Sequence, residues 1–131
     1  MPNEPHWLPI DAVINHNRLE TEATGEPHFL RDRGLLESAL ARPRNFFSFG
    51  EEDVLVLGVV LMAGVARAHA FEQGNKRTAF EALWHFLRIN GYDLAIDDAL
   101  PWADAVIALV EHRSTEEDFV RAIRPFVVPA G

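Results

Sequence analysis

The longest apolar run of the chain extends from Val54 to Ala68 and, apart from Arg67, leaves no polar face on a helix. A helix that is apolar on all sides belongs in a protein core. Three acidic residues immediately before it, at positions 51–53, complement the dipole of its first turn. The run is shorter than the roughly 20 residues of a membrane span and contains two glycines. We therefore expect a buried central helix and no contact with a membrane.

A second helical pattern follows after a short polar interval. Apolar residues recur at the spacing i, i+3, i+4, i+7 and i+8, which is the pattern of one helix face. This spacing predicts a helix that begins near Asn75 and is terminated by Gly91, because glycine favours the end of a helix. The apolar positions are Ala79, Ala82, Leu83, Phe86 and Leu87.

Four further helices are predicted from start and stop signals. Prolines in a first turn and a capping-box sequence mark helix starts, and proline or glycine marks the ends. The predicted helices are 10–18 after Pro9, a short one at 34–41 that stops before Pro43, 97–110 with Pro101 in its first turn, and a last one that follows Ser114–Glu117 and ends near Pro125. Strand patterns are almost absent. We expect one all-α domain over residues 1–131, a bundle of about six helices around the buried one.

The segment Asn45–Gly50 does not fit this pattern. It holds three phenylalanines in four positions, Phe46, Phe47 and Phe49 with Ser48 between them, and Pro43 precedes it. The segment is too short for a helix, so we expect an extended excursion or a small hairpin. Two interpretations stay open: the rings fill the core, or they form an exposed apolar edge that binds a peptide by strand addition.

Charge and composition narrow the classes of function. The chain has 131 residues, no cysteine and a net charge of −8. It cannot form disulfides, and its first residues lack a secretory pattern, so we expect a cytoplasmic protein. Such an acidic chain is a poor candidate for direct nucleic-acid binding. Between Arg67 and Arg88, however, four cations face two anions. This positive island suits a small anionic ligand.

The island centres on residues 69–80, which connect the two strongest helical patterns. Gly74 lets the backbone approach a ligand, and the helix that begins at Asn75 offers free N–H groups to an anion. Lys76 and Arg77 add two positive charges at the same helix start.

A histidine precedes this predicted anion site. His69 can accept a proton near neutral pH, and Arg67 is close enough in sequence to reach the same anion. A base beside an anion site predicts phosphoryl or nucleotidyl transfer. From the residues alone, a structural histidine and a solvated Lys-Arg pair remain the stronger interpretation.

The segment resembles the signature of the Fic/Doc superfamily, His-x-Phe-x-(Asp/Glu)-(Gly/Ala)-Asn-(Gly/Lys)-Arg. The matching residues are His69, Phe71, Gly74, Asn75, Lys76 and Arg77. The lysine at the eighth place and the short chain resemble the death-on-curing (Doc) branch. The resemblance extends from about Gly34 to the end of the chain and implies the all-helical Fic/Doc fold.

For the Doc branch, the resemblance implies a toxin that transfers the γ-phosphate of ATP to a threonine of elongation factor Tu. It implies that His69 is the general base and that Gly74 and Asn75 form the anion nest. Lys76 and Arg77 would hold the phosphates with Arg67 in support, and Phe71 would anchor the loop. The segment Phe46–Phe49 would be the flap that binds the target.

One position departs from the family pattern. Gln73 stands at the fifth place, where the family has an acid that binds Mg²⁺, and an amide oxygen is a weaker ligand than a carboxylate. Two alternatives to the kinase therefore stay open, an AMP transferase and a catalytically silent binding module. We find no convincing copy of the family's self-inhibitory (Ser/Thr)-x-x-x-Glu helix, since Thr21 is followed four places later by Gly25 and Ser114 by Asp118. The resemblance therefore implies a separate small antitoxin as partner.

Overall fold

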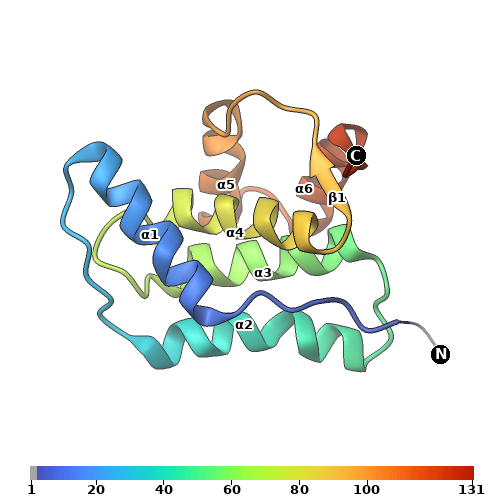
Figure 1. Cartoon of the computed structure of the whole chain (residues 1–131), viewed down its shortest axis with the longest axis horizontal. Helices are drawn as coiled ribbons and strands as arrows, with labels where there is room; N and C mark the ends of the chain where they lie inside the picture. Colours follow the sequence, from blue (N-terminus) through green and yellow to red (C-terminus); the bar gives the residue numbers. More distant parts are fainter. Residues whose placement is uncertain (1–2) are drawn as a thin grey trace.

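A computed structural model describes residues 3–131, and within this range the chain forms six α-helices, one of which lies at the centre (Figure 1). The all-α prediction is confirmed. None of the helices in the described range is long and apolar enough to cross a membrane. The helices are α1 Ile10–Thr24, α2 Arg33–Ser48, α3 Val54–Ala68, α4 Asn75–Ile89, α5 Ala103–Val110 and α6 Glu116–Ile123.

The central helix α3 has the bounds that the apolar run predicts, and every residue from Leu57 to Ala66 is buried. The carboxylate of Asp53 caps its first turn by accepting the backbone N–H of Leu55 at 3.0 Å. Figure 1 shows α3 between α2 and α4, and α5 and α6 also contact it. The helix is thus covered by four others, as its apolar sequence requires.

α3 and α4 approach each other most closely at Gly58. A Cβ atom added to Gly58 would lie 2.7 Å from Cδ1 of Leu83 and 3.2 Å from Cδ2 of Phe86, and both of these side chains are fully buried. This contact fixes the spacing of the two helices that flank the 69–74 loop.

α1 packs against α4 and is six residues longer than predicted. The sequence after Arg18 is polar and carries no apolar stripe, so the pattern alone could not extend the helix. In the fold, Asn17 and Thr21 are fully buried polar residues on α1. The helix ends at Gly25, which adopts a left-handed conformation with φ of 72°.

The prediction for residues 43–50 is wrong. α2 does not stop before Pro43 but continues through it to Ser48. Proline removes one N–H donor, and burial of the Pro43 ring offsets that loss. Phe47 packs edge-on against Trp7 with ring centroids 5.9 Å apart, while Phe49 is 92 % exposed just after the helix. The segment Phe46–Phe49 is therefore no extended flap.

The C-terminal part matches the predicted order of helices with shifted boundaries. The predicted helix at 97–110 begins with a 3₁₀ turn, η1 Leu100–Trp102, and only then becomes α5. Thr115 caps α6 in a capping box with Asp118, one residue later than the sequence suggests. A second 3₁₀ turn, η2 Arg124–Phe126, follows α6. Two short antiparallel strands, β1 Tyr92–Leu94 and β2 Val127–Pro129, pair the end of the chain with the segment that follows α4.

The close contact at Gly58 predicts that Gly58→Ala lowers stability. Alanine favours the helix by about 1 kcal/mol, but the added methyl group must displace the buried Leu83, which typically costs about 1–3 kcal/mol. We expect a net loss of about 1 kcal/mol in a urea titration. Gly34→Ala is the matched control, because a Cβ there meets only Asp32 Oδ1 at 3.4 Å. A Gly58→Ala protein as stable as the wild type would contradict the tight packing.

The contact between α1 and α4 predicts a pH dependence. Nε2 of His16 lies 2.9 Å from Nδ1 of His85, and burial, followed by the charge of His85, lowers the pKa of His16. The unfolded chain therefore binds more protons than the folded chain near this pKa. The contribution of His16 to the free energy of unfolding is therefore fully present above pH ~6.5 and is lost as the pH falls through the lowered pKa of the folded state.

We expect thermal melts of the wild type to show a larger loss of Tm between pH 7 and pH 5 than melts of His16→Gln. His6→Gln is the control, because His6 is exposed. An equal loss in His16→Gln and wild type would assign the acid sensitivity to other groups.

Candidate functional site

The loop between α3 and α4 carries the motif. His69 ends α3 in a left-handed conformation, with φ of 49° and ψ of 40°, and its side chain is exposed. Gly74, with φ of 75°, turns the chain into α4, whose first residue is Asn75. Two backbone reversals thus place the histidine at one end of the loop and the helix N-terminus at the other.

Phe71 and Asn75 close this loop. The Phe71 ring is fully buried, as expected for the residue that anchors the loop. The Asn75 side chain accepts the N–H of Phe71 at 3.0 Å and donates to the carbonyl of Phe71 at 2.8 Å. Because both ends of the Asn75 amide are used within the loop, its side chain shapes the nest, and its backbone N–H is what it offers to an anion.

An extended segment between α1 and α2 runs beside the motif. Leu30 pairs with Phe71 in an antiparallel bridge, and the N–H groups of Arg31 and Asp32 both donate to the carbonyl of Ala70, at 2.8 and 3.1 Å. Phe29, whose side chain is 56 % exposed, lies in the same segment. The extended segment next to the motif is therefore 26–32, which the sequence pattern did not mark.

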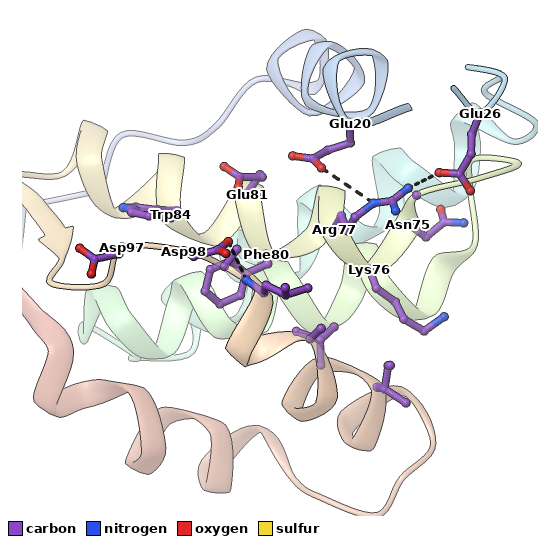
Figure 2. Close-up of a pocket in the computed structure, with 16 residues that line it drawn as sticks. Glu20, Glu26, Asn75, Lys76, Arg77, Phe80, Glu81, Trp84, Asp97 and Asp98 are labelled. Atoms are coloured by element: carbon purple, nitrogen blue, oxygen red, sulfur yellow. Dashed lines mark hydrogen bonds and ion pairs between the residues drawn. The ribbon is translucent and has the colours of Figure 1, made fainter. Parts of the chain in front are cut away.

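A cavity of about 650 Å³ lies along the start of α4 (Figure 2). Four predicted anion-binding residues line it together, Gly74, Asn75, Lys76 and Arg77. His69 and Gln73 precede these residues in the loop and are exposed outside its lining. The structure thus brings four of the five predicted phosphate-binding residues together at one cavity, with the predicted base at the other end of the loop.

The wall of this cavity is acidic, which the sequence did not predict. Five carboxylates face two cations: Glu20, Glu26, Glu81, Asp97 and Asp98 against Lys76 and Arg77. Burial raises the pKa of Glu81, and the negative charge of Glu20 raises it further. The cavity therefore combines a positive helix N-terminus with an acidic lining.

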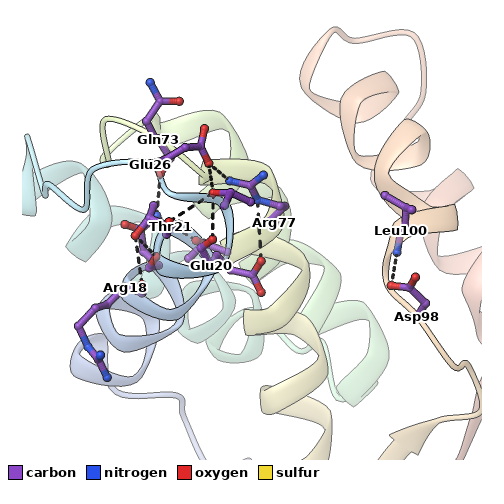
Figure 3. Close-up of polar contacts among 11 residues, drawn as sticks. Arg18, Glu20, Thr21, Glu26, Gln73, Arg77, Asp98 and Leu100 are labelled. Carbon is purple, nitrogen blue, oxygen red and sulfur yellow. Dashed lines mark hydrogen bonds and ion pairs between the residues drawn. The ribbon is translucent and has the colours of Figure 1, made fainter.

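Arg77 is held by two of these acids (Figure 3). Its Nη2 pairs with the carboxylate of Glu26, and its Nε lies 3.8 Å from Oε2 of Glu20. A hydrogen bond from the Thr24 hydroxyl, followed by the one from Arg77, lowers the pKa of Glu26. In the described part of the chain, Lys76 has no carboxylate partner. Lys76 is thus the more available cation of the pair.

Arg67 serves a different part of the fold than predicted. Its Nη1 pairs with Oε2 of Glu116 at 3.1 Å, and its Nη2 donates to the carbonyl of Leu109 at 3.1 Å. Arg42 binds the same carboxylate at 3.1 Å. Arg67 does not line the cavity. The expectation that it supports the bound anion is corrected: it ties α3 to α5 and α6.

Asn17 and His28 contact the motif and were missed by the sequence reasoning. The Asn17 amide donates to the carbonyl of Gln73, and its oxygen accepts from His28. The signal for Asn17 was present, since Val13, Asn17 and Thr21 recur at i, i+4 and i+8, which puts two polar residues on a buried face. Glu26 and His28 had no such signal.

Within the described residues, no group of three or more His, Asp or Glu side chains could hold a metal ion by itself. Gln73, at the place of the family's acid, has an exposed side chain. A Mg²⁺ ion typically keeps several waters and takes one or two protein ligands plus substrate phosphates. The described residues therefore form no protein-only cage, and Gln73 is the candidate ligand for such a shared site.

Two comparisons with known proteins support the family resemblance that this loop carries. The model of the Fic/DOC family matches residues 7–87, which include α1 to α4 apart from the last two residues of α4. The chain is also 38 % identical over 96 residues to "Toxin Doc" of Mycolicibacterium smegmatis, an alignment that covers 71 % of this chain and 73 % of the relative. On this evidence, the chain belongs to the Fic/Doc family.

Proposed function

We propose that this chain is a Doc-like toxin that transfers the γ-phosphate of ATP to a hydroxyl group of a protein. The observation that carries the proposal is the 69–77 loop, with an exposed histidine at one end and a lysine-bearing helix N-terminus on a cavity at the other. Membership of the Fic/Doc family and the likeness to a relative named "Toxin Doc" support the class of reaction.

His69 acts as the general base in this proposal. It takes the proton of the attacking hydroxyl as the hydroxyl oxygen bonds to the γ-phosphorus. The bond from the γ-phosphorus to the bridging oxygen breaks, and ADP leaves. The backbone of His69 is held in place, since its carbonyl accepts a hydrogen bond from Nη2 of Arg31 at 3.2 Å.

The start of α4 binds the phosphates. The free N–H groups of the first turn and the ammonium of Lys76 supply positive charge at the cavity. Arg77 adds its guanidinium when a phosphate displaces Glu26. The amide oxygen of Gln73 would hold a Mg²⁺ ion together with the phosphates, and the ion would neutralise phosphate charge. Such neutralisation would suit a cavity with an acidic lining.

The target protein binds beside the extended segment 26–32 in this proposal, in place of Phe46–Phe49. The segment already lies against the motif through Leu30 and Phe71, and Phe29 offers an exposed ring. A peptide that adds to this segment would bring its hydroxyl towards His69. We propose a threonine of a translation factor such as elongation factor Tu as the target.

The proposed partner in the cell is a small antitoxin protein, by analogy with the toxin branch of the family. The same reasoning places the protein in the cytoplasm, where translation factors act, and requires neither a membrane nor direct binding to nucleic acid.

A catalytically silent binding module is the second candidate, and two observations favour it. Gln73 replaces the metal-binding acid, and Arg77 is engaged by Glu26 and Glu20. Such a module would bind nucleotide without turnover.

His69→Ala tests the enzyme. With purified protein, Mg²⁺ and elongation factor Tu, we expect label from [γ-³²P]ATP to reach the target and label from [α-³²P]ATP not to reach it. Loss of the base should lower the rate by roughly 10²- to 10⁴-fold. His6→Ala, an exposed histidine outside the motif, is the control and should react as the wild type does.

The alternatives give different results in the same assay. Transfer of the α label would identify an AMP transferase, and nucleotide binding without any transfer would identify the silent module. Transfer at the wild-type rate by His69→Ala would remove His69 from the mechanism.

Glu26→Gln tests the ion pair at Arg77. Removing this carboxylate frees the guanidinium for phosphate, so we expect ATP to bind roughly two- to fivefold more tightly in calorimetry, the size of one surface ion pair. The gain should shrink as salt rises. Glu37→Gln, which breaks a pair with Arg33 on α2, is the matched control. Unchanged affinity in Glu26→Gln would show that Arg77 does not reach the nucleotide.

A further inference from the structure

We propose that Asn17 is a positioning residue for the motif loop and that His28 sets the orientation of its amide. Neither belongs to the signature. The inference rests on the proposed function, because it concerns how the loop that bears His69 and the start of α4 are held in register.

Asn17 makes three side-chain hydrogen bonds from a fully buried position on α1. Its Nδ2 donates to the carbonyl of Gln73 at 2.7 Å and to the hydroxyl of Thr78 at 3.1 Å. Its Oδ1 pairs with Nδ1 of His28 at 2.7 Å. The two acceptors flank the turn at Gly74, one before it and one in the first turn of α4. Asn17 thus connects both sides of the turn to α1.

The orientation of the Asn17 amide follows from these partners. The Gln73 carbonyl can only accept, so the Nδ2 group must face it, and Oδ1 must face His28. The Nδ1 of His28 is then the donor. The ring of His28 also lies 6.2 Å from that of Phe71, at an interplanar angle of 34°.

Because Asn17 is fully buried, the loss of any of its hydrogen bonds is costly. Water cannot replace a lost partner at a fully buried amide, so an unpaired Asn17 side chain would carry its desolvation cost. The N–H of Thr78 donates to the carbonyl of Gly74 at 2.9 Å, so the same contacts set where α4 begins. The first N–H groups of α4 are the proposed phosphate donors. A shift of about 1 Å in such a group can cost 10²-fold in rate.

Two variant pairs test the inference. Asn17→Asp keeps the shape and removes both donated hydrogen bonds. Its control is Thr21→Val, also fully buried on α1, whose hydroxyl bonds only to the carbonyls of Asn17 and Arg18. His28→Asn keeps a donor at the place of Nδ1, whereas His28→Leu removes it. Since His28 is exposed, this second pair should fold even if Asn17→Asp does not.

The first readout needs no nucleotide. Amide hydrogen exchange at residues 74–78 should be about tenfold faster in Asn17→Asp than in Thr21→Val at matched global stability. The second readout is turnover: kcat should fall roughly 10- to 100-fold in Asn17→Asp with a much smaller change in KM, while His28→Asn keeps more activity than His28→Leu.

Equal exchange and equal kcat in Asn17→Asp and Thr21→Val would overturn the inference, as would a His28→Asn protein no better than His28→Leu in either readout. If the wild type transfers no phosphate, the proposed function fails, and the exchange comparison still decides whether Asn17 positions the loop.

Discussion

A helix that is apolar on every side cannot be covered by one neighbour, and α3 is such a helix. Its burial requires α2, α4, α5 and α6 to surround it. The close approach at Gly58 then sets the distance to α4, and the Arg67–Glu116 pair ties its last turn to α6. The backbone leaves the enclosed helix at its C-terminal end, where the side chain of His69 is exposed. A single packing requirement thus brings the histidine to the surface at the start of the loop that leads into α4.

The site combines two opposed electrostatic features. The N-terminus of α4 and Lys76 favour an anion, while five carboxylates line the same cavity. Glu26 occupies Arg77, so a phosphate that reaches this guanidinium must compete with an internal acid. This balance disfavours a free anion and favours one whose charge is shared with a divalent cation. The proposed nucleotide site is therefore rich in acidic residues, as is the chain as a whole.

Most of the helical framework could be predicted from the sequence, because it depends on local patterns. The bounds of α3 follow from its apolar run, and the start of α4 follows from Gly74 and the periodicity of its apolar face. The failures lie where distant contacts override a local rule. α2 continues through Pro43 because the Pro43 side chain is buried and Phe47 packs against Trp7. The phenylalanines therefore lie on or next to a helix and form no flap.

The sequence by itself determined the family, the buried helix, the order of the helices and the loop that carries His69, Gly74 and Lys76. These features are readable because each depends on residues close together in the chain. Only the tertiary structure decided the partners: Glu116 for Arg67, Glu26 for Arg77, Asn17 for the carbonyl of Gln73, and segment 26–32 as the extended neighbour of the motif. Those contacts join residues that lie about 40 to 60 positions apart, so their pairing depends on how the helices pack and on no local pattern.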